Sequence, residues 1–359
     1  MAAKLENKAA WQTEAQSKLL KVAPGPDQND PLADEVIIKV AAVAINPSEW
    51  KMQDFSYLPL EYPHVLGSDV AGEIFKVGSG VTRFQAGDRV IGHCLGLLYG
   101  GARHGSFQAY TACREVVVAK IPDELPFDHA VVLPLGLSTS ITGLFEHLAL
   151  ELPSVDRKSL GKTVLIWGGS SSMGSTAIQL AAASGYEVLT TASERNHAYV
   201  KSLGASEVFD YSGPGVTKEL IQRLSRTDFA GVYDCIGEEH STRACAEVLS
   251  KFGGGVLPTV LWPPNDLPAN VKPVLGELNP SSTTVKSLTI SAVYATNPGL
   301  VPNHVGVEIW RDFVPAALKT GTLQAKPEPK LVDGGLDGIQ DAMNLQKKGV
   351  SAQKLVVKL

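Results

Sequence analysis

A chain of 359 residues exceeds the usual size of one domain and predicts two, each with enough volume for a buried core. Its composition, 44% hydrophobic and 19% charged, is typical of a globular α/β protein and excludes a disordered chain. The net charge of −5 argues against a nucleic-acid partner, and no apolar run is long enough for a signal peptide or a bilayer span. The four cysteines form no C-x-x-C and no disulfide framework, so we expect a reducing, cytoplasmic setting.

The first third of the chain is predicted to be rich in short strands. Apolar and β-branched runs separated by glycine turns indicate strands at 36–43, 69–77, 88–91, 107–111 and 116–121. Closely spaced short strands of this kind predict a partly closed β-barrel.

From about residue 126 the pattern becomes one of alternating helices and strands, which is typical of a doubly wound parallel sheet. Helices are expected at 126–133 and 137–149, and strands at 163–167, 187–191, 207–209, 231–235, 255–260 and 286–293. The Pro-rich stretch 262–284 is expected to be a surface loop. A helix at 305–319, a linker at 324–330, a helix at 336–347 and a strand at 354–358 follow. We expect that last strand to return to the barrel, which gives one domain of residues 1–125 and 308–359 and another of residues 126–307.

The segment 162–183 carries the motif with the most chemical meaning. A β-branched strand at 163–167 meets Gly168 and Gly169, three serines follow, and Gly174 opens a helix. A strand, a tight glycine turn and a helix bring backbone N–H groups against a diphosphate. Because the spacing is not G-x-G-x-x-G, the motif alone is a weak signal and depends on its context.

The second strand of this region supplies that context. An acidic residue just after it would hold the 2′-hydroxyl of NAD, but Ser193 stands there, with Arg195 and Lys201 nearby. A hydroxyl and two cations suit a 2′-phosphate, which favours NADP(H). Glu194 opposes this interpretation, and the alternative is that the two cations lie on a solvated helix face.

Several blocks resemble, in order and spacing, the medium-chain dehydrogenase/reductase superfamily over nearly the whole chain. They are AINPS at 44–48, LGSDVAG at 66–72, VG at 77–78, AGDRV at 86–90, GSFQAY at 105–110 and KIP at 120–122. Within it, the chain is similar to the zinc-free, quinone oxidoreductase-like branch. The pieces NPSEWKM, VFDYSG and SAQKLVVKL further resemble fungal trans-acting enoyl reductases and the CipB- and ToxD-like "zinc-binding" oxidoreductases. The resemblance implies a GroES-like substrate domain, a Rossmann domain, and NADPH between the two.

A catalytic zinc needs three protein ligands with one open position. The zinc enzymes of the superfamily carry a cysteine and a Gly-His-Glu block, and by resemblance the matching positions of this chain are Asn46 and Gly67-Ser68-Asp69. The structural cysteine cluster of those enzymes is missing from this chain. The nearby histidines and cysteine fit no familiar ligand spacing: His64, His93, Cys94 and His104. We therefore expect no metal, and we expect Asp69 to be a structural carboxylate within a strand.

The motif and the resemblance together predict the cofactor-binding residues. The diphosphate is expected at Gly169, Ser171, Ser172 and Met173, the 2′-phosphate at Ser193 and Asn196, and the adenine end at Tyr211. Cys235 and Ile236 end the fourth strand, where ligands of open α/β sheets gather, and Val260, Tyr294 and Ala295 are expected beside the nicotinamide. The alternative for Cys235 is a buried thiol with no cofactor contact.

When a hydride adds to an enoyl thioester or enone, charge grows on the carbonyl oxygen and the α-carbon then needs a proton. Lys51 is a candidate donor, with water as the alternative source and a solvated surface lysine as the alternative role. Asn46 is a candidate amide donor to the carbonyl, or the side chain of a local turn before Pro47. By resemblance Thr139 contacts the nicotinamide or its ribose; otherwise it caps a helix.

The leading functional hypothesis is an NADPH-dependent, zinc-independent reductase of an activated C=C bond in an enoyl thioester or enone. Its substrate is a small molecule or carrier-bound, with a polyketide synthase as a partner. The alternatives are a quinone oxidoreductase on the same scaffold and an NADPH-binding sensor or scaffold with little turnover. We expect neither nucleic acid nor a membrane as a partner, and a monomer and a homodimer both stay open.

Overall fold

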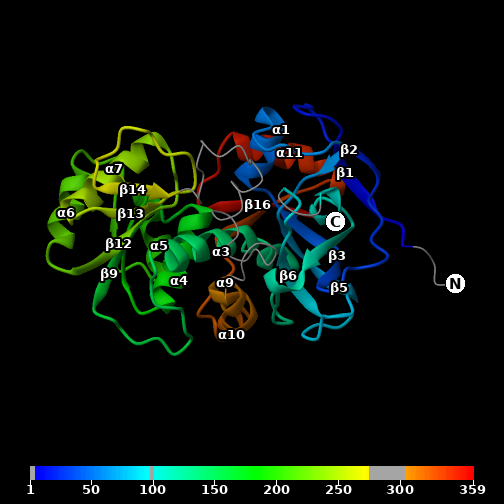
Figure 1. Ribbon diagram of the computed structural model, residues 1–359, viewed down its shortest axis with the longest axis horizontal. Coiled ribbons are helices and arrows are strands. Elements are labelled where there is room, and N and C mark those ends of the chain that lie inside the picture. The colour runs from blue at the N-terminus through cyan, green and yellow to red at the C-terminus, as the bar shows by residue number, and fades with distance from the viewer. Residues whose placement is uncertain (1–4, 98–100, 275–303) are drawn as a thin grey trace. The chain divides into compact units, whose positions relative to one another are not determined.

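The computed structural model describes residues 5–97, 101–274 and 304–359. The chain divides into two compact units, one of Met1–Leu135 with Glu328–Leu359 and one of Gly136–Pro327 (Figure 1). The first unit is thus discontinuous in sequence. Helix α10 (Val314–Thr320), which the sequence-based boundary placed in the first domain, lies in the second unit. No helix of the described residues has the length and apolar character needed to cross a membrane.

The first unit is built on a mixed seven-stranded sheet with the order β15-β16-β3-β5-β6-β8, and β7 pairs with β3 (Figure 1). These strands are β3 (Glu35–Ala44), β5 (Asp69–Val77), β6 (Arg89–His93), β7 (Tyr110–Arg114), β8 (Val118–Lys120), β15 (Glu328–Val332) and β16 (Gln353–Lys358). A smaller sheet joins β2 (Lys21–Pro24), β1 (Lys8–Gln12) and β4 (His64–Val65), and the helices are α1 (Pro47–Phe55), α2 (Phe127–Ala130) and α11 (Gly335–Lys347). Short 3₁₀ turns occupy Gly101–His104 and Glu115–Val117.

The predicted strands of this unit are present, β5 with the predicted bounds, whereas the strand predicted at 107–111 begins three residues later as β7. The last strand returns to the sheet as predicted, because β16 runs antiparallel to β3 with Val356 opposite Ala44. Two expectations need correction. The linker predicted at 324–330 contains the start of β15, an edge strand in which a proline is tolerated. The helix predicted at 126–133 is shorter in the structure, where α2 spans only Phe127–Ala130.

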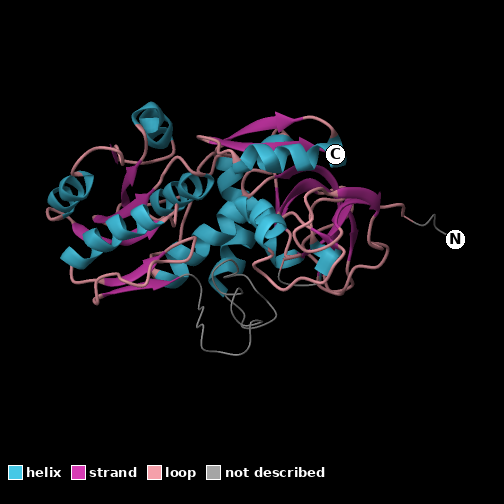
Figure 2. Ribbon diagram, turned by 90° about the horizontal axis from the view of Figure 1, so that it is seen from above, coloured by secondary structure: helices cyan, strands magenta, loops and turns pink. Residues whose placement is uncertain are grey.

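The second unit contains a parallel four-stranded sheet with the order β11-β10-β9-β12, flanked by helices (Figure 2, strands magenta and helices cyan). Its strands are β9 (Lys162–Trp167), β10 (Glu187–Thr191), β11 (Glu207–Phe209) and β12 (Asp228–Asp234), with the parallel pair β13 (Gly255–Pro258) and β14 (Val271–Val274). The helices are α3 (Pro134–Ile141), α4 (Ser172–Ala183), α5 (His197–Ser202), α6 (Val216–Leu224), α7 (Glu239–Lys251), α9 (His304–Glu308) and α10, with a 3₁₀ turn at Glu194–Asn196. The strand order reverses between β9 and β12, which is where ligands of open α/β sheets bind.

The core of the second unit lies between the sheet and helices α6 and α7. Fully buried apolar side chains from strands and helices make it up: Leu165, Leu189, Leu220, Val232, Val248 and Leu257. The burial is nearly continuous along β9 and β10, as expected for parallel strands that are covered by helices.

Three expectations for the second unit are modified. The stretch 262–284 was predicted to be a loop, but β14 forms within it by pairing with β13. The helices predicted at 137–149 and 305–319 each contain a wide π-helical turn, at Thr142–His147 and Ile309–Phe313. Pro315 lies just after the second turn and has no N–H group to donate to it. The strand predicted at 286–293, together with Tyr294 and Ala295, lies outside the described residues.

Candidate active site

The turn after β9 is shaped so that only glycine fits at its bends. Gly168 has a φ of +81°, and the N–H of Gly169 donates to the carbonyl of Thr191 at 2.9 Å. A Cβ atom on Gly169 would lie 2.2 Å from Thr190 Oγ1, and one on Gly174 would lie 2.2 Å from the carbonyl oxygen of Gly168. The turn therefore folds tightly against the start of α4. A side chain at Gly169 or Gly174 would collide with neighbouring atoms of this turn or of β10.

Helix α4 begins at this turn with its positive end. Ser171 is the N-cap, and its Oγ accepts a hydrogen bond from the N–H of Gly174 at 2.9 Å. Ser172 and Met173 then form a first turn that contains no acidic residue. A helix N-terminus of this kind suits an anion, since its N–H groups and dipole both favour negative charge. The predicted residues Gly169, Ser171, Ser172 and Met173 thus come together in a cradle that fits a diphosphate.

Tyr199 in α5 also belongs to this region, and sequence reasoning missed it. Its hydroxyl lies 2.8 Å from Ser175 Oγ in α4, and Ser175 Oγ in turn donates to the carbonyl of Gly169 at 3.3 Å. Burial raises the pKa of Tyr199 to about 12, so the phenol keeps its proton. No local sequence signal pairs these residues, because the contact depends on the packing of α5 against α4.

The structure brings Ser193 and Asn196 together at the end of β10. The Nδ2 group of Asn196 donates to Ser193 Oγ at 3.2 Å, while Arg195 between them is exposed. Glu194 is exposed as well. Tyr211 lies two residues beyond β11 and is 47% exposed, which leaves its ring accessible to a planar ligand.

Cys235 and Ile236 follow β12 directly and lie at the point where the strand order reverses. The N–H of Cys235 donates to the carbonyl of Trp167 at 3.1 Å, and a Cβ atom on Gly168 would lie 2.4 Å from the Ile236 side chain. Cys235 is buried, and burial raises the pKa of its thiol well above the ordinary value. It is therefore an inert thiol beside the glycine turn rather than an activated nucleophile.

Thr139 lies inside α3, so it does not cap that helix. Its carbonyl accepts a hydrogen bond from the Tyr233 hydroxyl at 3.2 Å, and it shares a small recess with Tyr233 and Thr259 at the ends of β12 and β13. A Cβ atom on Gly143 would lie 2.7 Å from the Tyr233 ring, so the wide turn needs glycine there. Val260 follows Thr259 directly, which places it at the same edge of the sheet.

In the first unit, α1 carries Lys51, and Asn46 is the N-cap residue of this helix. The Asn46 amide is buried, with Oδ1 accepting from Lys354 Nζ at 2.5 Å and Nδ2 donating to Asp69 Oδ2 at 2.8 Å. Lys354 Nζ also lies 3.0 Å from Asp69 Oδ2. Lys51 is half-buried, and its Nζ lies 5.7 Å from the centre of the Trp50 ring. Sequence reasoning assigned no role to Lys354, whose local sequence indicates only a strand.

Two buried groups beside this network have displaced pKa values. Burial, and then the charge of Asp69, raise the pKa of Glu49 from 4.5 to about 7, against hydrogen bonds from Asn46 and Ser68 and the charge of Lys354. Burial lowers the pKa of His93 to about 4, so its ring is neutral near pH 7. Asp69 is fully buried at the start of β5, and its Oδ1 accepts from the N–H of Leu135 at 2.6 Å.

The histidines and cysteine that invited a metal interpretation have separate surroundings. His104 Nε2 lies 2.6 Å from Glu35 Oε1, and Cys94 Sγ lies 3.6 Å from Thr111 Oγ1. Burial lowers the pKa of His64 to about 4. Within the part of the chain that the structure describes, no three His, Cys, Asp or Glu side chains come close enough to hold a metal ion.

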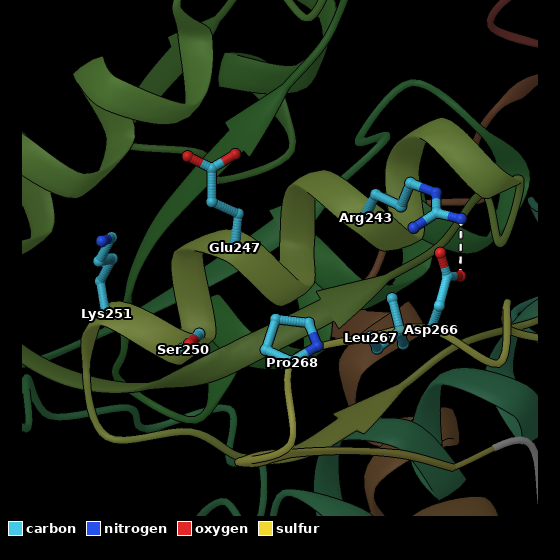
Figure 3. Close-up of a pocket in the computed structure, with 7 residues that line it drawn as sticks. All are labelled: Arg243, Glu247, Ser250, Lys251, Asp266, Leu267 and Pro268. Carbon is cyan, nitrogen blue, oxygen red and sulfur yellow. Dashed lines mark hydrogen bonds and ion pairs between the residues drawn. The ribbon is translucent and has the colours of Figure 1, made fainter.

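A surface hollow of about 260 Å³ lies along α7, and it contains none of the predicted residues (Figure 3). Arg243 crosses its rim to Asp266 at 2.7 Å. Its lining mixes both signs of charge on exposed and half-buried side chains: Arg243, Glu247, Ser250, Lys251, Asp266, Leu267 and Pro268. The glycine turn, with its close backbone packing and helix N-terminus, is the better candidate for a cofactor.

Comparisons with known proteins find two family matches in different parts of the chain. Residues 32–123 match the alcohol dehydrogenase GroES-like domain, and residues 172–305 match the zinc-binding dehydrogenase family. The chain is 47% identical to the trans-enoyl reductase himH of Aspergillus japonicus over 99% of this chain and 98% of that protein. It is 39% identical, over 100% of both chains, to the zinc-binding alcohol dehydrogenase domain-containing protein cipB of Emericella nidulans.

Two further likenesses cover most of the chain. The enoyl reductase component lovC of the lovastatin nonaketide synthase, from Aspergillus terreus, is 34% identical over 91% of this chain and 89% of that protein. An alcohol dehydrogenase superfamily protein from Novosphingobium aromaticivorans superimposes with a TM-score of 0.75 at 26% identity, covering 98% of this chain and 99% of that one. The predicted GroES-like and Rossmann-type architecture is thereby confirmed. The chain belongs to the medium-chain dehydrogenase/reductase superfamily, whose enoyl reductases bind a nicotinamide cofactor, and it is an oxidoreductase.

Proposed function

We propose that the protein is an NADPH-dependent, zinc-independent reductase that saturates the C=C bond of an enoyl thioester and acts in trans with a polyketide synthase in the cytoplasm. The observation that carries the proposal is the 47% identity to a trans-enoyl reductase over nearly the full length of both chains. The glycine and serine turn before α4 supports it, because this turn suits a dinucleotide diphosphate.

The proposal assigns the cofactor to residues of the second unit. The diphosphate would be held by Gly169, Ser171, Ser172 and Met173, the 2′-phosphate by Ser193 and Asn196 with Arg195, and the adenine by Tyr211. Thr139, Cys235, Ile236 and Val260 would surround the nicotinamide. When bound, the cofactor supplies the hydride for the β-carbon of the substrate. The preference for NADPH rests on Ser193, since no carboxylate stands where a 2′-hydroxyl would be held.

Lys51 is proposed to stabilise the charge that develops on the thioester oxygen. Its ammonium group would donate a hydrogen bond to this oxygen, and either Lys51 or water would protonate the α-carbon. For Asn46 the contacts support a different role from direct donation. Both ends of its amide are engaged by Lys354 and Asp69, so the residue holds the start of α1 rather than the substrate.

Zinc independence rests on the residues at the expected ligand positions. Asn46 and Ser68 replace a cysteine and a histidine, and a buried lysine ammonium lies beside Asp69. Elemental analysis of the purified protein tests this part: a stoichiometric amount of zinc would contradict it.

Rapid-mixing measurements of NADPH oxidation test the reaction. We expect a crotonyl thioester to react faster than a quinone or a simple enone, and NADPH to react faster than NADH. A quinone that reacts fastest would instead favour the quinone oxidoreductase. Tight NADPH binding without oxidation by any acceptor would favour a sensor or scaffold protein.

Lys51→Met, compared with Lys51→Arg, tests the assigned donor. We expect Lys51→Met to lower kcat by about 10²-fold, since positioned acid and charge stabilisation contribute at least this much. Lys51→Arg keeps the positive charge and should retain more activity. An unchanged kcat in Lys51→Met would remove Lys51 from the chemistry.

A further inference from the structure

A fully buried network of charged and polar side chains lies at the start of α1 in the first unit. Lys354 comes from β16 and Asp69 from β5, Asn46 is the N-cap residue of α1, and Glu49 lies in the first turn of α1. None of the four side chains is more than 4% exposed. Burial of an ammonium group is costly unless it is paired and hydrogen-bonded, so the position of Lys354 is defined by these partners.

The network fixes the orientation of the Asn46 amide. The oxygen of the amide faces the Lys354 ammonium at 2.5 Å, and its nitrogen faces the Asp69 carboxylate at 2.8 Å. The reversed amide would point its NH₂ group at a cation and its oxygen at an anion. Only one orientation is therefore compatible with Lys354 and Asp69.

The same network holds the first turn of α1. The backbone N–H of Asn46 donates to Glu49 Oε2 at 2.5 Å, and the buried face of the helix consists of Glu49, Met52 and Gln53. Lys51 lies between these positions in sequence and is only half-buried, so it projects from another side of the helix. A shift of the first turn would move Lys51 together with the helix.

We propose that Lys354 and Asp69 are positioning residues for the reduction, which clamp both ends of the Asn46 amide and so fix where α1 presents Lys51. This inference rests on the proposed function. Lys354 also supplies the buried positive charge that pairs with the Asp69 carboxylate, at the place where zinc-dependent members of the superfamily carry metal ligands. The positive charge of this network thus belongs to a side chain of the protein, Lys354.

Three variants of the full-length protein test the clamp: Lys354→Met, Lys354→Arg, and the charge-balanced double variant Lys354→Met with Asp69→Asn. We expect Lys354→Met to lower kcat by about 10- to 100-fold, because a displacement of about 1 Å in a reacting group costs this much. The Kd for NADPH should stay within about twofold of the wild type, because the cofactor residues lie in the second unit. Lys354→Arg, which keeps the cation, should recover most of the loss.

The double variant separates positioning from stability. It removes both charges, so its Tm should return toward that of the wild type, while Asn46 Oδ1 still lacks its donor and kcat should stay low. Recovery of both Tm and kcat in the double variant would overturn the proposal. Lys354 would then matter only because it neutralises the buried charge of Asp69, and not because it positions Asn46. A wild-type kcat in Lys354→Met would overturn it as well.

Hydrogen exchange of the α1 amides distinguishes this proposal from the proposed function. The clamp predicts faster exchange of α1 in Lys354→Met and near wild-type exchange in Lys354→Arg, whatever substrate the enzyme reduces. Inactivity of the wild type toward every enoyl thioester would refute the proposed function, and the exchange data would still decide the clamp. Unchanged exchange of α1 in Lys354→Met would overturn the clamp even if the enzyme reduces thioesters.

Discussion

Substitution of Glu49 by glutamine should change how stability depends on pH. In the folded protein the pKa of Glu49 is raised from 4.5 to about 7, chiefly by burial. The unfolded chain therefore loses this proton at a lower pH than the folded chain, and stability falls as pH rises from about 4.5 to about 7. This change in pKa corresponds to a loss of roughly 3 kcal/mol in the free energy of unfolding of the wild type. Glutamine does not ionise, so Glu49→Gln does not lose this free energy. The glutamine oxygen can still accept the N–H of Asn46.

The measurement compares Glu49→Gln with the wild type between pH 4.5 and 8. Hydrogen exchange of first-unit peptides in increasing urea gives the free energy of unfolding of that unit alone, which matters in a chain with two units. Relative to the wild type, the variant should gain about 3 kcal/mol across this range. Glu73→Gln, which changes an exposed carboxylate on β5, is the matched control.

Two buried histidines act in the opposite direction but do not disturb the comparison. Burial lowers the pKa of His64 and of His93 to about 4, so each contributes stability that is lost as pH falls from 6.5 toward 4. Both are present in wild type and variant, and their contributions cancel in the difference. A difference that stays constant over the whole pH range would refute the assignment of a proton to Glu49.

Three further predictions concern the second unit. Ser171→Ala should lower the stability of α4 by about 1 kcal/mol through loss of the N-cap, as measured by hydrogen exchange, whereas Ser171→Thr should not; equal effects would exclude the cap. Gly143→Ala should lower the free energy of unfolding by about 1–3 kcal/mol, because the added Cβ meets the Tyr233 ring at 2.7 Å; an unchanged Tm would contradict this packing. A thiol reagent should leave all four buried cysteines unmodified in the native protein and label them after denaturation; rapid native labelling of Cys235 would disprove its burial.

Regular strands of the second unit could be predicted from the sequence because their signal is local. The strands β10 and β11 have the predicted bounds, since short β-branched runs bordered by glycine or serine leave few alternatives. The glycine turn could also be recognised, because its residues are contiguous in the chain. In contrast, α1 was not predicted, since two of the three residues on its buried face are Glu49 and Gln53 rather than apolar side chains.

The roles of residues that contact partners far away in the sequence could not be predicted. The Lys354–Asn46 hydrogen bond joins positions 308 residues apart in the chain, and the sequence around Lys354 indicates only a strand. Tyr199 meets Ser175 only through the packing of two helices. The edge strand β15 was predicted to be a linker because its Lys and Pro residues are typical of one, although both are tolerated at a sheet edge.

The pairing of β16 with β3 has a consequence for biosynthesis. All of the second unit is translated between these two strands, so a ribosome completes it before β16, one of three strands that pair with β3, emerges. Until then Asn46 and Asp69 lack their cation, and residues 42–44 of β3 lack the strand with which they pair. We expect the second unit to resist protease first on stalled ribosomes, with the first unit gaining protection only after β16 has left the exit tunnel.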